Sequence, residues 1–328
     1  MNLNHGVFTI SLDVELNWGV RNGHVAASYA KNLAGAGRAV TEMLTLFREH
    51  GIHATWAVVG FLFFRDHDEL KRHVPSVLPA YADSSLSPYR YMDQCAALDR
   101  GLHFAPELID SIRETDGQEI GTHTFSHYYC CEEGQDAAAF RADLEAAVQT
   151  AERRGIETRS LVFPRNQYRA AYLPVLRELG LSAYRGPEDA GLYRAMSGRK
   201  HNRAPRRALR LMDSYLNLTG HHVHALADLH NGGVHNIAAS RFLRPCSGHS
   251  PGLEHLRLKR ITAAMTDAAR RGGLYHLWWH PHNWGADLEG NAAFLRKILQ
   301  HFADLRRRYD MQPLNMGEVS ALLESRPA

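Results

Sequence analysis

Residues 47–60, FREHGIHATWAVVG, contain the pattern that decides the fold. A charged amphipathic stretch ends at Gly51, and an apolar run rich in Val and Trp follows it. Glycine just past the end of a helix readily adopts the left-handed cap conformation, which most other residues avoid. An apolar run with few charges is typical of a buried strand in a parallel sheet. The stretch therefore predicts a helix followed by a strand.

The same pattern recurs along the chain, at AERRGIETRSLVF (151–163), LRELGLSAYRG (176–186) and AARRGGLYHLWWH (268–280). Two further strands are predicted at FTISLDVE (8–15) and QEIGTH (118–123). Amphipathic periodicity predicts helices over residues 36–49, 97–115, 137–154, 253–271 and 291–309. Strands that alternate with helices indicate an α/β fold with a parallel sheet.

The chain has 328 residues, enough for one large α/β domain or two modest ones. Two segments, 61–103 and 187–250, interrupt the alternation with Pro, Gly, Ser and His. Long irregular insertions of this kind usually serve as binding loops or lids. We therefore predict a single domain over residues 1–328 that carries two elaborated loops.

Composition argues against several classes of protein. The net charge is +3 and the basic residues are scattered, which does not indicate nucleic-acid binding. RRALR (206–210) is the densest basic cluster, and we interpret it as a solvated face. No apolar stretch approaches the roughly 18–20 residues of a membrane span. The start, MNLNHGVFTISLDVE, lacks the pattern of a signal peptide, so we expect a cytoplasmic protein whose four cysteines are free thiols.

Polar side chains gather where the predicted strands end. Asp13 and Glu15 follow FTISL, His123 and His127 follow QEIGT, and Arg165 follows SLVFP; LYHLWW is followed by His280 and His282. The carboxyl ends of the strands are where barrel-like βα folds place their chemistry. Taken singly, each residue has a structural explanation: HxxxH is a weak signal, an Asp can cap a turn, and a His can be a partnered core residue. His276, on the same strand face as His280, is expected to be such a core histidine.

The spacing of these residues suggests a metal site. Residues i and i+2 of a strand share a side, so both carboxylates can enter one pocket. One helical turn places imidazoles four residues apart on one face. Two imidazoles and a carboxylate are a common ligand set for a catalytic divalent metal. The other carboxylate could take a proton from water, a further His could donate one, and Arg165 could hold the base ionised.

These residues lie in motifs that resemble those of the polysaccharide deacetylase (NodB-homology, carbohydrate esterase) family. GQEIGTHTFSH is very close to the family's second motif, GHEIGNHTxSH. The other matches are TISLDVE to the first motif, HATWAVVG to the ATFFVVG strand, FPRNQ to the third motif and LWWHPHN to the fifth. Together they run from about residue 8 to residue 284. The chain resembles a divergent, cytoplasmic branch of this family.

The resemblance implies a distorted (β/α) barrel and a divalent metal, commonly zinc, with Ni²⁺, Co²⁺ or Fe²⁺ as alternatives. By resemblance, Asp13 is the general base and His280 the general acid. His123 and His127 are metal ligands, and Arg165 orients the base.

Two motifs depart from the family pattern. The family's metal-binding second Asp is replaced by Val14, and Glu15 is the nearest substitute ligand. Pro precedes Arg165 and Asn166 follows it, so the oxyanion donor is either the backbone N–H or the side chain of Asn166. His282 competes with His280 for the role of acid, and His280 is favoured because it closes the strand.

The resemblance implies hydrolysis of an N-acetyl or similar acyl group on an amino sugar. Our hypothesis is a nucleotide- or lipid-linked precursor of a surface glycan such as an O-antigen or capsule. Predicted substrate contacts are Asn17, Trp18, Trp279, His282, Asn283 and Trp284. The alternatives are a metal-dependent hydrolase of a non-sugar cyclic amide or formamide, and a non-catalytic glycan-binding protein with a decayed site.

Overall fold

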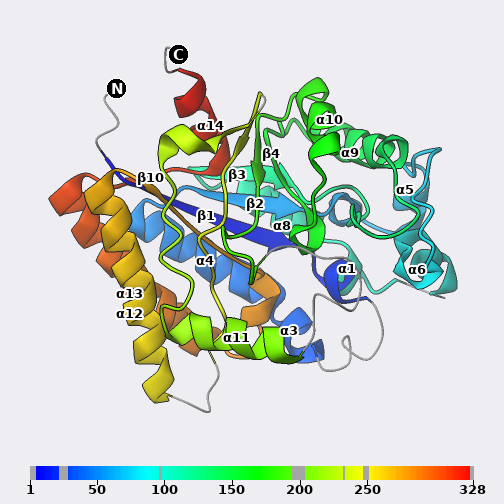
Figure 1. Ribbon diagram of the computed structural model, residues 1–328. Coiled ribbons are helices and arrows are strands. Elements are labelled where there is room, and N and C mark those ends of the chain that lie inside the picture. Colours follow the sequence, from blue (N-terminus) through cyan, green and yellow to red (C-terminus); the bar gives the residue numbers. More distant parts are fainter. Residues whose placement is uncertain are drawn as a thin grey trace.

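The computed structural model describes residues 5–21, 29–95, 98–193, 204–231, 233–246 and 251–325. A curled, mostly parallel sheet runs through the middle of the molecule, with helices packed around it (Figure 1). Its strands are β1 (Val7–Val14), β2 (Ala54–Val58), β3 (Gln118–Thr122), β4 (Ser160–Val162), β5 (Ala183–Arg185), β6 (His230–Asn231), β7 (Val234–Asn236), β8 (Arg241–Phe242), β9 (Leu274–Trp279) and β10 (Gln312–Pro313).

The sheet order is β6-β7-β5-β4-β3-β2-β1-β9-β8, with β10 paired to β1. One segment, residues 234–243, joins the two ends of this order. The amide of Ala239 donates to the carbonyl of Gly186, just after β5, at 2.9 Å, and the next amide, that of Ser240, donates to His276 in β9 at 2.8 Å. The sheet is thereby closed into an irregular barrel, which confirms the predicted distorted (β/α) barrel.

The helices are α1 (Asn17–Val20), α3 (Ala30–Ala34), α4 (Ala36–His50), α5 (His67–Lys71), α6 (Pro88–Gln94), α7 (Arg100–His103), α8 (Pro106–Arg113), α9 (Ala137–Glu152), α10 (Leu173–Glu178), α11 (Ala204–Tyr215), α12 (Pro251–Arg271), α13 (Leu288–Tyr309) and α14 (Met316–Glu324). α4, α12 and α13 pack together on one side of the barrel (Figure 1). Helix α4 ends at Gly51, whose φ of 59° is the left-handed cap that the opening pattern predicts.

Most predicted elements are confirmed, and two expectations need correction. The helix expected over 97–115 is split into α7 and α8, because Pro106 disfavours helical geometry in the residue before it. The segment 187–250 is more than an insertion, since it contributes β6, β7 and β8 to the sheet and the bonds that close the barrel. That the whole chain forms one domain stays a prediction.

Alternate residues of β1 and β9 line the barrel interior. Ser11 of β1 pairs in register with Trp278 of β9. The buried His276 ring shares its Nε2 with the Ser11 hydroxyl at 2.8 Å, and its Nδ1 lies 2.8 Å from the carbonyl of Ile237. His276 is thus the partnered core histidine that the sequence predicts. Within the described ranges, no helix has the length and apolar character needed to cross a bilayer.

Candidate active site

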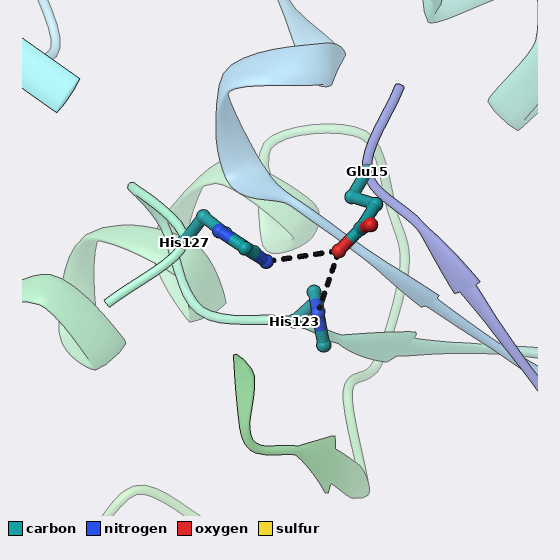
Figure 2. A group of neighbouring side chains, drawn as sticks. All are labelled: Glu15, His123 and His127. Carbon is teal, nitrogen blue, oxygen red and sulfur yellow. Dashed lines mark hydrogen bonds and ion pairs between the residues drawn. The ribbon is translucent and has the colours of Figure 1, made fainter. Parts of the chain in front are cut away.

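Glu15, His123 and His127 meet at the carboxyl ends of β1 and β3. The Oε2 atom of Glu15 lies 2.9 Å from Nε2 of His127 and 3.4 Å from Nε2 of His123 (Figure 2). All three side chains are buried, and one ligand atom from each lies within 4.8 Å of the others. The sequence prediction that these three residues converge is therefore matched by their geometry.

The hydrogen bonds of His123 leave one nitrogen available to a metal. Its Nδ1–H donates to the carbonyl of Val162 at 2.8 Å, which places the lone pair on Nε2. That Nε2 is buried, lies 3.4 Å from Oε2 of Glu15 and makes no hydrogen bond within the described part of the chain. A metal-bound histidine typically shows this arrangement, with the second nitrogen held by a carbonyl.

The protonation states of the other two residues also suit a cation. Burial lowers the pKa of His127 to about 3, so its imidazole is neutral near pH 7. Burial alone would raise the pKa of Glu15, but the facing imidazoles of His280, His123 and His127 bring that pKa well below its usual range. Tetrahedral zinc with ligands at roughly 2.0–2.2 Å separates neighbouring ligand atoms by about 3.4 Å. The residues therefore fit a divalent metal with small adjustments.

Gly19 makes room for the Glu15 side chain, a feature that the sequence analysis missed. A Cβ atom on this glycine would lie 2.0 Å from Oε1 of Glu15 and 2.1 Å from its carboxyl carbon. No real Cβ contact is so short, so any larger residue would displace the carboxylate.

The loop after β3 is held in place from below by Asp143 of α9. This buried carboxylate accepts hydrogen bonds from the amide of Phe125 at 2.8 Å and from both the amide and the hydroxyl of Ser126. The loop needs this support because Thr124 and His127 adopt positive φ angles of 64° and 61°. Such conformations are costly for non-glycine residues and persist where surrounding contacts enforce them.

Asp13 is held by Arg185, not by Arg165. Nη1 and Nη2 of Arg185 donate to Oδ1 and Oδ2 of Asp13 at 2.7 and 2.8 Å, a bidentate pair that is buried on both sides. Burial alone would raise the pKa of Asp13, but the guanidinium of Arg185 and the imidazoles of His123 and His280 outweigh it and lower that pKa. The Asp13 carboxylate is consequently ionised at neutral pH.

The expected role of Arg165 is therefore wrong. Its guanidinium stacks on Tyr129, 3.8 Å from the ring centroid, and lies 3.5 Å from Glu132. Its side chain is 39% exposed. Arg185 closes β5, so the rule that functional residues follow strand ends would have found it in LSAYRG.

Of the two candidate acids, His280 has the better position. Its Nε2 lies 3.5 Å from Oε1 of Glu15 and 3.7 Å from Oδ2 of Asp13, and its side chain is 23% exposed. His282 is only 3% exposed, and burial lowers its pKa to about 4. A neutral, enclosed His282 can neither donate a proton near pH 7 nor contact a substrate readily.

Asn166 offers its side chain, and not its backbone, as an oxyanion donor. Its amide is used in a hydrogen bond to the carbonyl of Phe163 at 2.9 Å. Its Oδ1 accepts from Nη2 of Arg185 at 3.0 Å, which leaves Nδ2 with no partner among the described residues. Asn166 has a φ of 51° and lines the cavity beside His280.

Most predicted aromatic substrate contacts are wrong, because the side chains lie in the core. Trp18, Trp279 and Trp284 are at most 1% exposed. Their neighbour Trp278 is the aromatic residue that reaches the site: it lines the cavity, and Arg185 lies 4.1 Å above its ring. Trp278 and His280 are two residues apart and so share a strand face, and this spacing predicts that Trp278 lies near the site.

The two predicted asparagine contacts differ. Asn17 is 4% exposed, and its Nδ2 is occupied by the hydroxyl of Tyr91 at 2.8 Å and Nε2 of His103 at 2.9 Å. It is therefore closed to substrate in this conformation. Asn283 is 9% exposed, and its backbone carbonyl accepts from Asn32 at 3.0 Å. Its role toward a substrate stays a prediction.

A cavity of ≈ 230 Å³ opens beside these groups. It is lined by Asn166, Glu188, Tyr193, Arg210, Ser214, Arg241, Phe242, Arg244, Trp278 and His280. Two of these are catalytic candidates, so the cavity borders the cluster of Asp13 and the three ligands. Seven of the ten lining residues come from residues 187–250, the segment that the sequence predicted to be an insertion.

Comparison with solved structures shows the same fold. A Mycobacterium smegmatis protein assigned as a polysaccharide deacetylase is 16% identical, with a TM-score of 0.60 over 99% of this chain and 96% of that one. The GH57-type branching enzyme of the archaeon Pyrococcus horikoshii is 12% identical, with a TM-score of 0.55 over 98% and 71% of the two chains. A 4-alpha-glucanotransferase from Thermococcus litoralis is 11% identical, with a TM-score of 0.51 over 98% and 41%.

No curated protein sequence matches the chain. A family model does match: residues 34–184 fit the model described as polysaccharide deacetylase. This range contains β2, β3, β4 and both histidines of the ligand cluster. Residues 34–184 are therefore similar to the polysaccharide deacetylase family, and the chain shares the fold of the Mycobacterium smegmatis protein.

Proposed function

We propose that the protein is a metal-dependent hydrolase that removes an N-acetyl or similar acyl group from an amino sugar in a surface-glycan precursor. The observation that carries the proposal is that a set of three possible metal ligands lies next to a carboxylate and an imidazole. Glu15 and the two histidines of the β3 loop form a ligand set. Directly beside it lies Asp13, ionised by Arg185, within 3.7 Å of His280.

Each residue has one role in this reaction. Glu15, His123 and His127 would hold the cation. A divalent metal bound there supplies a Lewis acid that polarises the acyl carbonyl and acidifies water. Asp13 accepts the proton of the attacking water, since Arg185 keeps its carboxylate ionised and fixes its orientation.

The remaining groups act on the substrate. Nδ2 of Asn166 donates a hydrogen bond to the acyl oxygen as negative charge develops, a contribution of roughly 3–4 kcal/mol for such donors. His280 donates its proton to the departing amine. Its position between the two carboxylates and the cavity lets it contact both the proton source and the leaving group.

Acetate release from a panel of N-acetylhexosamines tests the proposal. We expect the metal-loaded protein to release acetate and an equal amount of free amine from at least one member. Asp13→Asn should lower the rate by roughly 10²–10⁴-fold, the range for loss of general-base catalysis. Asp228→Asn, a change of an exposed residue in the short helical turn Leu226–Leu229, is the matched control and should behave like wild type.

Two outcomes would contradict the proposal. Hydrolysis of only non-sugar cyclic amides or formamides would favour the alternative hydrolase. Glycan binding that survives Asp13→Asn, with no acyl hydrolysis by any metal-loaded form, would favour a binding protein. The surface-glycan precursor and a cytoplasmic location are further parts of the proposal, and cell fractionation checks the latter.

A further inference from the structure

The cavity beside His280 is unusually rich in guanidinium groups. Arg210, Arg241 and Arg244 line it, whereas Glu188 is the one carboxylate among its lining residues. Glu188 is buried and accepts a hydrogen bond from the indole of Trp278 at 3.3 Å. The cation excess at the lining has no role in the deacylation steps derived above.

The Arg241 side chain is held in the cavity wall through its Nη1 atom. Its Nη1 donates to Oδ2 of Asp213 at 2.6 Å and to the hydroxyl of Tyr193 at 3.0 Å. Arg241 is only 4% exposed, yet its Nη2 has no hydrogen-bond partner among the residues that the structure describes. A buried guanidinium nitrogen without an acceptor carries a desolvation cost, which an anionic ligand in the cavity would offset.

The single carboxylate behind Arg241 does not neutralise this wall. Asp213 also lies 3.6 Å from Arg260, so two guanidinium groups share it. Arg244 has no carboxylate within ion-pair distance in the parts of the chain that the structure describes. Burial, together with the positive charges of Arg257 and Arg241, lowers the pKa of Arg244 despite nearby tyrosines.

We propose that this cavity binds a phosphate group attached to the amino-sugar substrate. The inference rests on the proposed function, because His280 lines the same cavity and would face the acylated nitrogen while the arginines hold the phosphate. Arginine suits phosphate since its fork of N–H donors can contact two oxygens at once. The substrate is then a sugar phosphate, from either a nucleotide or a lipid carrier.

The test includes a lipid-linked form of the substrate because α11 offers an apolar surface beside the cavity. This helix places Arg210 and Ser214 in the cavity wall and leaves Leu209, Leu211 and Met212 between 46% and 49% exposed. An apolar surface next to a phosphate site suits a substrate whose phosphate carries a long hydrocarbon chain. A nucleotide carrier would make no use of that surface.

The experiment compares kcat/KM of the metal-loaded full chain for four forms of one N-acetyl amino sugar. These are the neutral methyl glycoside, the 1-phosphate, and carrier-linked forms with either a nucleoside diphosphate or a polyprenyl phosphate in detergent. We expect the phosphate-bearing forms to exceed the neutral one by roughly 10- to 100-fold, as for one or two charge-assisted hydrogen bonds.

Variants connect that preference to the cavity. Arg244→Gln should bring the ratio of phosphate to neutral substrate toward one. Arg241→Lys, which retains the charge paired with Asp213, should reduce the ratio by a smaller factor. Arg207→Gln is the matched control, since Arg207 lies one turn from Arg210 on α11, is exposed and does not line the cavity.

The outcomes separate the two proposals. Equal rates on neutral and phosphorylated sugars, or a preference for a sugar carboxylate over the phosphate, would overturn the phosphate site. If no sugar is hydrolysed, the proposed function fails, and binding of inorganic phosphate by calorimetry still tests the cavity. Phosphate binding that Arg244→Gln weakens about tenfold would then support the site, and binding that this variant leaves unchanged would refute it.

Discussion

The two sides of the barrel mouth use charge in opposite ways. At the ends of β1 and β3, Glu15 faces the imidazoles of His123 and His127, and the nearby Asp143 accepts hydrogen bonds from N–H and O–H donors. Along α11 and residues 234–246, guanidinium groups outnumber buried carboxylates, as where Asp213 meets both Arg241 and Arg260. The first side is arranged to receive a cation, and the second carries a surplus of cations.

Asp13 lies where the two sides meet. Its oxygens are bound by Arg185 from β5, while its own strand leads to Glu15 two residues later. Arg185 lowers the pKa of Asp13 more than any other group does, and the imidazoles of His123 and His280 lower it further. The following changes test that distinction, beginning with the largest expected effect.

Substitution of Arg185 should lower stability and kcat/KM far more than substitution of Arg165. Arg185→Ala leaves Asp13 as an uncompensated buried charge, at a cost of about 3–5 kcal/mol in the free energy of unfolding. Misplacement of the base should lower kcat/KM on the order of 100-fold. Arg185→Lys, which retains the charge without the bidentate fork, should recover stability more than activity.

The matched change Arg165→Ala should alter the free energy of unfolding by no more than about 0.5 kcal/mol, the usual range for surface positions. Urea unfolding and steady-state kinetics measure both quantities. Equal losses in Arg165→Ala and Arg185→Ala would show that the base is held in some other way.

On the metal side, the sharpest change is one methyl group at Gly19. Gly19→Ala would place a carbon against the Glu15 carboxylate and push it from the two histidines. Metal affinity should fall by roughly 10- to 100-fold, as when a ligand's supporting contacts are lost. Competition with a chelator measures the affinity.

Gly37→Ala is the control for that substitution, because a Cβ at this position in α4 would meet no atom within 4 Å. It should leave metal affinity unchanged and raise stability by up to about 1 kcal/mol through helix propensity. Unchanged affinity in Gly19→Ala would mean that Glu15 does not need its observed position.

The two buried carboxylates should respond to pH with opposite signs. Burial raises the pKa of Asp143 to about 6, so the folded state holds this proton more tightly than the unfolded chain. Its contribution to stability should fall as the pH rises from about 4 to about 6, by about 1.4 kcal/mol for each unit of pKa difference.

For Asp213, burial would raise the pKa, but the hydrogen bonds from Tyr193 and Arg241 outweigh it and bring the pKa well below its usual range. Its stabilisation is present above pH ~4 and is lost as the pH falls below that value. Unfolding of metal-free Asp143→Asn and Asp213→Asn against wild type across this pH range measures both. If both residues changed the free energy of unfolding in the same direction with pH, the difference between the two sides would be refuted.

The convergence of Glu15, His123 and His127 could be predicted from the sequence because these residues lie in short contiguous motifs. Asp13 and Glu15 share a strand face by their spacing of two, and His123 and His127 belong to one loop. In each case the residue spacing within one short segment decides which side chains share a face, so few other arrangements are possible. His280 followed from the same rule at the end of β9.

The arginine side was missed because its residues are brought together only by barrel closure. Arg185, Arg210 and Arg241 lie in separate segments, and no local spacing connects them. RRALR was interpreted as a solvated face, which fits the exposed Arg207 but not Arg210 in the cavity wall. Trp279 was predicted as a substrate contact in place of Trp278, although only Trp278 lies on the same strand face as His280.

The most direct test of the account is the metal content of protein purified without added ions and then equilibrated with zinc. We predict about one tightly bound ion per chain in wild type and in His230→Ala, a change of an exposed histidine on β6. Glu15→Ala and His123→Ala should each lose the ion. A wild-type protein that stays metal-free, or a Glu15→Ala protein that retains a full equivalent, would contradict the claim that the first strand and the β3 loop share one cation.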